Sequence, residues 1–158
     1  MRKLIIFLSV FIAVSMSAQI KWLTINQALE NQKINPKKIL INFYSEDCQT
    51  CVDLENHTFT NHTIKKIMNN SFYAVKFDIK SKEQIEFLGR TFVNNQKDGV
   101  HNFSRFMNIN STPTIVFFDE SAQPITNLMG SFTAKDAEPY FTLISNNEYK
   151  KIKTRQQW

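Results

Sequence analysis

The chain has 158 residues, of which 42% are hydrophobic and 13% aromatic, and this size and composition suit one compact domain with a sizeable core. Its 19 Lys and Arg residues outnumber its 14 Asp and Glu residues, giving a formal net charge of +5. The basic residues are spread along the chain, and the small group at Lys150, Lys151, Lys153 and Arg155 is typical of a solvated helix end. The absence of a basic patch interleaved with aromatics argues against a nucleic-acid-binding protein.

The first 18 residues have the pattern of a secretory signal peptide. Arg2 and Lys3 form a basic start, residues 4–14 are apolar, and small residues precede a cleavage point after Ala18. The apolar run is about half of the ~20 residues that a membrane-spanning helix needs, and an uncleaved anchor is the alternative. We therefore expect an exported mature domain over residues 19–158 that does not span the membrane.

Helical and extended patterns alternate along the rest of the chain. Thr24 and Gln27 can form a capping box, which marks a helix start, and the apolar run Ile39–Tyr44 is typical of a strand buried on both faces. In chain order, we expect a helix from Thr24 to Lys33, a strand at Ile39–Tyr44, helices from Cys48 to His57 and from Thr60 or Asn61 onward, a strand at Phe72–Phe77, a short helix near His101, strands at Ile115–Phe118 and Ile125–Gly130, and a helix at Ala134–Ser145. This order predicts an α/β fold with a mixed central sheet flanked by helices.

Residues 81–100 fit this alternation least well. Ile85–Phe87 and Arg90–Phe92 alternate apolar with polar residues on either side of Leu88-Gly89. Glycine adopts the backbone conformation of a tight hairpin turn readily, so we predict a small β-hairpin with Gly89 in its turn.

The chemistry of the chain is concentrated in Cys48-Gln49-Thr50-Cys51, which holds its only two cysteines. They follow a buried strand and open a helix, so both sulfurs lie near one helix end, close enough to form a disulfide. The backbone N–H groups and the helix dipole stabilise a thiolate there. We expect Cys48 to be the attacking nucleophile and Cys51, inside the first turn, to resolve the mixed disulfide.

Two other interpretations of the cysteine pair remain open. A zinc site would need four ligands, and only three His residues accompany the two cysteines. A purely structural disulfide is disfavoured, because so short a loop removes little entropy from the unfolded chain. We accordingly expect neither a metal nor a cofactor.

A second feature is the sequence Ser111-Thr112-Pro113-Thr114, which precedes the apolar run Ile115–Phe118. A proline at the entry to a strand is compatible with a cis peptide bond. The chain resembles thioredoxin in four features taken together. A strand leads into Cys-x-x-Cys, and Thr-Pro-Thr precedes a second apolar strand, whose partner strand has Gly130 near its end. Residues 48–60 are similar to the periplasmic C-terminal domain of the disulfide reductase DsbD and to exported thioredoxin-like proteins of Bacteroidetes-type bacteria. The resemblance covers about residues 22–146 and implies a thioredoxin fold with a hairpin-like insertion around 81–100.

The resemblance also implies roles for five residues. Cys48 matches the nucleophile, Cys51 the resolving cysteine and Pro113 the cis-proline of the substrate groove. Thr112 would pair through its backbone N–H and C=O with a bound substrate strand. Glu55, one helical turn after Cys51, matches an acidic residue near the cysteine pair of the DsbD domain, although an ordinary solvated helix glutamate has the same pattern.

Two residues depart from the family pattern. Asp47 stands before Cys48 where most relatives have a tryptophan, which adds a negative charge. Asn42 stands in the buried strand where the relatives have an aspartate that shuttles protons. Asparagine does not titrate, so that proton route is absent or runs through Glu55.

Two classes of function follow. The first is an exported, monomeric thiol–disulfide oxidoreductase of the periplasm or the extracellular space, a reductase or exchange enzyme that takes electrons from a membrane donor and passes them to oxidised exported proteins. The second is a non-catalytic thioredoxin-like module that binds peptides and keeps its disulfide oxidised. The intact cysteine pair favours the first class, and the absent tryptophan and aspartate favour the second.

Overall fold

The structure is a computed structural model and describes residues 19–154. The predicted signal peptide, residues 1–18, lies outside the described residues. Within the described part of the chain, no helix is both long enough and apolar enough to cross a membrane.

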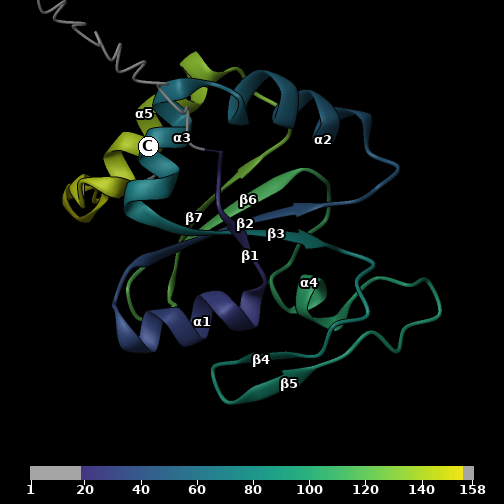
Figure 1. The fold of residues 1–158 in the computed structure, drawn as a ribbon. Helices are drawn as coiled ribbons and strands as arrows, with labels where there is room; N and C mark the ends of the chain where they lie inside the picture. Colours follow the sequence, from purple (N-terminus) through teal and green to yellow (C-terminus); the bar gives the residue numbers. More distant parts are fainter. Residues whose placement is uncertain (1–18, 155–158) are drawn as a thin grey trace, which may run out of the picture.

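A five-stranded mixed sheet forms the centre of the fold (Figure 1). The strands lie in the order β1 (Trp22–Leu23), β3 (Phe72–Asp78), β2 (Lys38–Tyr44), β6 (Thr114–Phe118) and β7 (Pro124–Met129). The central strand β2 pairs in parallel with β3 and antiparallel with β6, and six of its seven residues are buried. This burial explains the continuous apolar run in the sequence, because a strand covered on both faces has no solvent-facing side.

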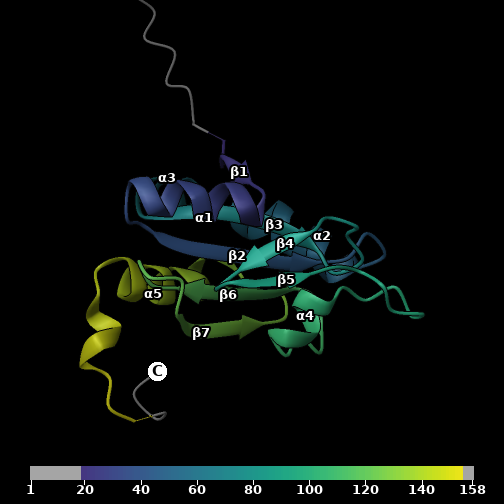
Figure 2. The same ribbon diagram turned by 90° about the horizontal axis from the view of Figure 1, so that it is seen from below.

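The sheet separates two hydrophobic cores. Helix α1 (Ile25–Ile34), the β-hairpin β4–β5 (Ile85–Phe87 and Arg90–Phe92) and α4 (Asn102–Phe106) cover one face, and α2 (Gln49–Leu54), α3 (His62–Ser71) and α5 (Ala134–Ser145) cover the other. Figure 2 shows the same layers from below, with α1 and the hairpin towards the viewer. The predicted fold class, a mixed sheet flanked by helices, is therefore confirmed.

Short polar signals set the helix boundaries. Thr24 caps α1 through the predicted capping box, in which its hydroxyl accepts from the Gln27 N–H and the Gln27 side chain accepts from the Thr24 N–H. The Asn61 side chain accepts from the N–H groups of Thr63 and Ile64 at the start of α3. Asn61 rather than Thr60 is therefore the capping residue.

Three elements differ from the sequence expectations. The two-residue strand β1 pairs in parallel with β3, at the edge of the sheet. The helix that begins after Cys48 continues beyond His57 as a π-helical turn, Glu55–Phe59. A 3-10 turn, Glu148–Lys151, occupies the first part of the segment that we interpreted as a solvated helix end.

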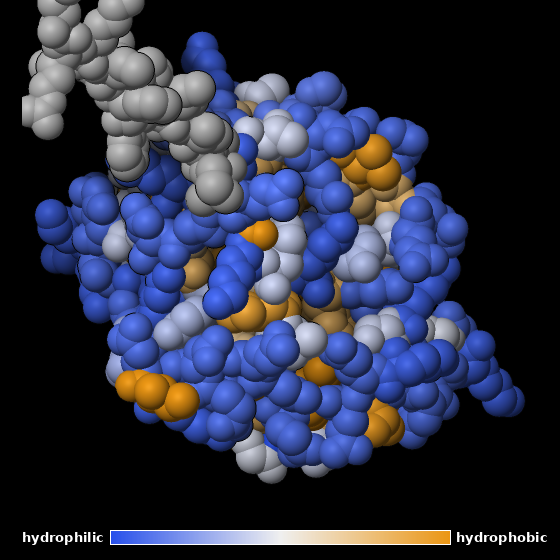
Figure 3. All heavy atoms as spheres, viewed as in Figure 1, coloured by the Kyte–Doolittle hydropathy of each residue, from blue (hydrophilic) through white to orange (hydrophobic). Residues whose placement is uncertain are grey.

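The predicted hairpin is present, and it belongs to the core on the α1 face. Ile85 and Phe87 are buried, and their side chains pack with Phe103 of α4. The Phe103 ring lies within 6 Å of four other aromatic rings, those of Phe43, Phe77, Phe87 and Phe92. Most of the surface on the face shown in Figure 3 is hydrophilic, with small and separate hydrophobic areas.

We expect the Phe103→Ala variant to lose about 3–5 kcal/mol of unfolding free energy, because it leaves a cavity at the centre of this aromatic cluster. Urea denaturation of the wild type and the variant measures the loss. Phe106→Ala is the matched control: Phe106 is the same residue type on the same helix but is 44% exposed, so its loss is expected to be about 1 kcal/mol. Equal losses in the two variants would contradict the assignment of Phe103 to the core.

Candidate active site

The two cysteines lie where the central strand ends and a helix begins. Strand β2 ends at Tyr44, and Cys48 is the N-cap residue of α2. Cys48 and Cys51 form a disulfide with an S–S distance of 2.13 Å. The two cysteines that the sequence analysis singled out are therefore within bonding distance, at the end of the helix where backbone N–H groups have no partner within the helix.

The two sulfurs have different surroundings. Cys48 is partly exposed, whereas Cys51 is 3% exposed. The backbone N–H of Cys51 donates to Cys48 Sγ at 3.1 Å, and the Thr50 hydroxyl lies 3.3 Å from the same sulfur. When the disulfide is reduced, a negative charge on Cys48 would meet these hydrogen-bonding groups and the positive end of the helix dipole.

The loop at Thr112–Pro113 reaches the same end of the sheet. The antiparallel register of β2 and β6 places Phe43 beside Thr114, so the chain enters β6 next to the point where β2 leads to Cys48. The Thr112–Pro113 peptide bond is cis, and the Pro113 carbonyl accepts from the Gly130 N–H at 2.8 Å. Thr112 is partly buried, and Pro113 is buried.

A buried hydrogen bond joins the cysteine helix to the segment after β7. Thr58, in the π-helical turn, is fully buried, and its hydroxyl donates to the carbonyl of Phe132. Phe132 follows Gly130 by two residues, and Gly130 in turn holds Pro113. Thr58 and Gly130 thus form a brace between the π-helical turn that follows α2 and the Pro113 loop, and no sequence pattern indicated it.

Asn42 is buried beneath the α2 side of the sheet. It is 1% exposed and shares its sheet face with Leu40, which belongs to the core that contains Leu54 of α2. Neither its side-chain oxygen nor its side-chain nitrogen has a hydrogen-bonding partner. The expected burial of Asn42 is confirmed, and its side chain offers no group that gains or loses a proton at ordinary pH.

Glu55 forms an ion pair with Lys76 of β3, which lies opposite Asn42 in the sheet register. The Lys76 Nζ also lies 4.4 Å from the centre of the Tyr44 ring. Sequence reasoning selected Glu55 but missed Lys76, although a lysine inside the apolar strand Phe72–Phe77 is a signal that could have identified it. The Glu55 side chain is 38% exposed and is held by this contact.

The charge of Asp47, beside Cys48, is also paired. Asp47 Oδ2 lies 3.0 Å from Lys80 Nζ, and both side chains are exposed. This contact raises the pKa of Lys80, through the hydrogen bond first and the charge of Asp47 second. Lys80 thus offsets the negative charge of Asp47 beside Cys48. Elsewhere among the described residues, no three His, Cys, Asp or Glu side chains are grouped as metal ligands.

The fold has counterparts among known proteins. A family model of the thioredoxin-like domain matches residues 25–144, and the chain belongs to that family. No curated protein matches it. A thioredoxin from Thermus thermophilus is similar in structure, with 15% identity over 80% of this chain and 88% of that one and a TM-score of 0.63. The DsbH oxidoreductase is similar with 17% identity over 82% of this chain and 86% of that one and a TM-score of 0.59. The reduced DsbD C-terminal domain from Neisseria meningitidis is also similar, with 12% identity over 74% of this chain and 94% of that one and a TM-score of 0.53. These likenesses establish the thioredoxin fold.

We expect the Thr58→Val variant to lose about 1–2 kcal/mol of unfolding free energy, because valine keeps the shape of threonine but leaves the Phe132 carbonyl without its donor. Thr63→Val, on the exposed surface of α3, is the matched control and should change stability by less than about 0.5 kcal/mol. Urea denaturation of both variants tests the brace. A Thr58→Val protein as stable as the control would show that this hydrogen bond contributes nothing.

Burial raises the pKa of Tyr44, and the Lys76 charge opposes this rise. The neutral phenol therefore contributes stability that is complete below the unfolded pKa of 10.0 and is lost as the pH rises through the higher folded pKa. We expect Lys76→Met to raise the pKa of Tyr44 further. Absorbance titration of each protein against its Tyr44→Phe counterpart measures this value, and Lys135→Met controls for net charge. A lower or unchanged pKa in Lys76→Met would contradict the contact.

Proposed function

We propose that this chain is an exported thiol–disulfide oxidoreductase that reduces or exchanges disulfides of other proteins through Cys48 and Cys51. The observation that carries the proposal is the asymmetry of the pair: one sulfur is partly exposed at a helix start and the other is buried one turn inside. Both lie at the end of the sheet where the Pro113 loop enters β6. A purely structural cross-link has no need of this asymmetry. Neighbouring folds named as an oxidoreductase and as a DsbD domain support the same class.

The reaction starts from the dithiol form. The Cys48 thiolate attacks one sulfur of a substrate disulfide, which forms a mixed disulfide and releases the other substrate sulfur as a thiolate. Cys51 then loses its proton and attacks Cys48 Sγ, which forms the Cys48–Cys51 disulfide and releases the second substrate sulfur. Two electrons pass to the substrate, and the two released thiolates take up protons. A reductant, for which we propose a membrane-bound dithiol donor, restores the enzyme.

We propose that the residues around the cysteines contact the substrate and transfer the proton of Cys51. Thr112 and Pro113, at the end of the sheet where Cys48 lies, would contact the backbone of the substrate segment that carries the disulfide. Asn42 does not titrate, so the proton of Cys51 would leave through Glu55 or directly to water. We propose that the enzyme acts as a monomer, in the periplasm or outside the cell, on oxidised exported proteins.

A non-catalytic peptide-binding module is the second candidate. The observation that favours it is the unpartnered Asn42 amide, which stands where an enzyme of this kind would profit from a buried proton acceptor. In such a module the disulfide would stay oxidised, and the surface around Pro113 would bind peptides without exchange.

We expect Cys51→Ser to accumulate mixed disulfides with substrate proteins, because the resolving thiol is missing, and Cys48→Ser to accumulate few. Non-reducing electrophoresis of each variant, incubated with an oxidised protein such as insulin, measures the trapped complex. The double variant, which has no thiol, is the control. Equal trapping by the two single variants would contradict the assigned order of the cysteines.

The redox potential of the pair separates the two candidates. Equilibration with glutathione should place an exchange enzyme above about −300 mV, whereas a permanently oxidised structural disulfide lies below that value. A potential in the lower range, together with no trapping, would favour the binding module.

A further inference from the structure

The tip of the hairpin β4–β5 has an unusual residue. Leu88 and Gly89 form its two-residue turn, and both have a positive φ, of 48° and 74°. A turn of this kind favours asparagine, aspartate or glycine at its first position, because a leucine there strains the backbone. Leu88 is also 54% exposed. Leucine is thus unfavourable at this position in both conformation and solvation, so the folding of the hairpin does not explain its presence.

Leu88 lies between two hollows of the surface. The first, of about 610 Å³, is a mainly apolar groove between the hairpin, α4 and β7, lined by Phe87, Phe106, Met107 and Val116 together with polar side chains such as Asn108 and Gln123. The second, of about 670 Å³, lies between α1, the hairpin and the turn after β6. Leu88 lines both hollows, so one segment that crosses the hairpin tip could occupy them together.

The apolar groove follows the last strand of the sheet. Strand β7 pairs only with β6 among the described strands, and none of its six residues is charged. Natural sheets protect such an edge with charged side chains, a proline, a bulge or a cover, and in β7 only Pro124 and the register shift beside it, at the start of the strand, serve this purpose. Residues 152–154 approach β7 from the α5 side, and none of them lines the groove. The groove therefore suits an extended segment with a large apolar side chain.

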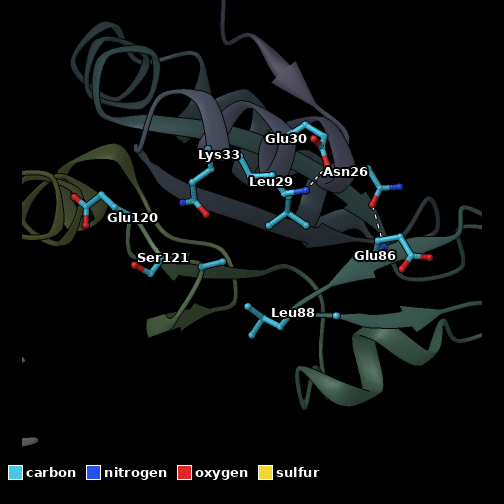
Figure 4. Close-up of a pocket in the computed structure, with 11 residues that line it drawn as sticks. Asn26, Leu29, Glu30, Lys33, Glu86, Leu88, Glu120 and Ser121 are labelled. Atoms are coloured by element: carbon cyan, nitrogen blue, oxygen red, sulfur yellow. Dashed lines mark hydrogen bonds and ion pairs between the residues drawn. The ribbon is translucent and has the colours of Figure 1, made fainter.

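The second hollow determines the charge of that segment. Its lining includes Glu30, Glu86 and Glu120 but only one cation, Lys33 (Figure 4). Glu30 pairs with Lys33 and Glu120 pairs with Lys38. Glu86 has no cationic partner among the described residues: its carboxylate accepts from the neutral side chains of Gln84 and Thr91, which hold it in place. A cationic side chain of a bound segment would therefore neutralise the charge of the Glu86 carboxylate.

We propose that these two hollows form a docking surface for an extended segment of another protein, in which a large apolar residue lies beside a lysine or arginine. The apolar side chain enters the groove against Phe106 and Leu88, and the cation reaches Glu86. The surface lies on the sheet face opposite α2, so it is separate from the cysteine pair. It would hold a partner independently of the thiol chemistry.

Peptide selection tests the proposal. Random peptides of about 12 residues without cysteine, displayed on phage, are selected on the disulfide-bonded protein, so that thiol exchange plays no part. We expect the selected sequences to share an aromatic or aliphatic residue with a lysine or arginine within two positions. A peptide of this consensus, synthesised with a fluorophore, then reports the dissociation constant by fluorescence anisotropy.

Leu88→Asn should weaken binding of this peptide by about tenfold or more. The variant keeps its fold, because asparagine suits the left-handed turn conformation and tolerates exposure. Glu86→Gln should weaken binding less and reduce its dependence on salt. Ile34→Asn is the matched control: Ile34 is 85% exposed on α1 and lines neither hollow, so binding should not change.

Four results would overturn the proposal: no enriched consensus, an acidic or purely apolar consensus, full binding by Leu88→Asn, or a wild-type dimer that Leu88→Asn converts to a monomer. The last result, measured by analytical ultracentrifugation, would assign the surface to contact between two copies of this chain.

Discussion

The central strand β2 is the constraint on which the rest of the structure depends. It is paired along both edges and covered on both faces, so its alternate side chains enter two different cores. Ile39, Ile41 and Phe43 face α1 and the hairpin, whereas Leu40 and Asn42 face the opposite side. A shift by one residue would move every side chain of β2 into the opposite core and would bring Asn42 among the apolar residues of the α1 face. The register of β2 is therefore fixed, and its C-terminal end determines where the chain turns towards Cys48.

The candidate site combines parts of the chain that are distant in sequence. The cysteines follow β2, Lys76 comes from β3, and Pro113 precedes β6. Two hydrogen bonds connect these parts. The Thr58 hydroxyl donates to the Phe132 carbonyl, and the Gly130 N–H donates to the Pro113 carbonyl. The π-helical turn belongs to this arrangement, since it carries Thr58. Both interactions end on backbone carbonyls, so the exposed side chains around Cys48 have no part in them.

The elements that local patterns specify could be predicted from the sequence. The apolar run of β2, the capping box at Thr24 and Gln27, and the hairpin around Gly89 all have short-range signals, and the structure contains them. The cysteine pair was identified for the same reason, because its spacing of three residues is visible in the chain.

What the sequence did not reveal depends on contacts between distant residues. Strand β1 has only two residues, too few to show a periodicity, and it exists because Trp22 lies beside Ala74. The ion pair between Glu55 and Lys76 needs the position of α2 over β3, which no local pattern contains. The brace from Thr58 to Phe132 spans 74 residues and has no signature apart from a threonine in a helix.

The separation of the two cores by the sheet has a consequence for how the molecule responds to change. The hairpin, α1 and α4 pack on one face, and α2, α3 and α5 pack on the other, with the paired backbones of five strands between them. Side chains with no shared neighbours contribute to stability almost additively, so a substitution on one face has little effect on packing on the other. The hairpin face can therefore acquire, lose or exchange residues while the geometry around the two sulfurs stays constant.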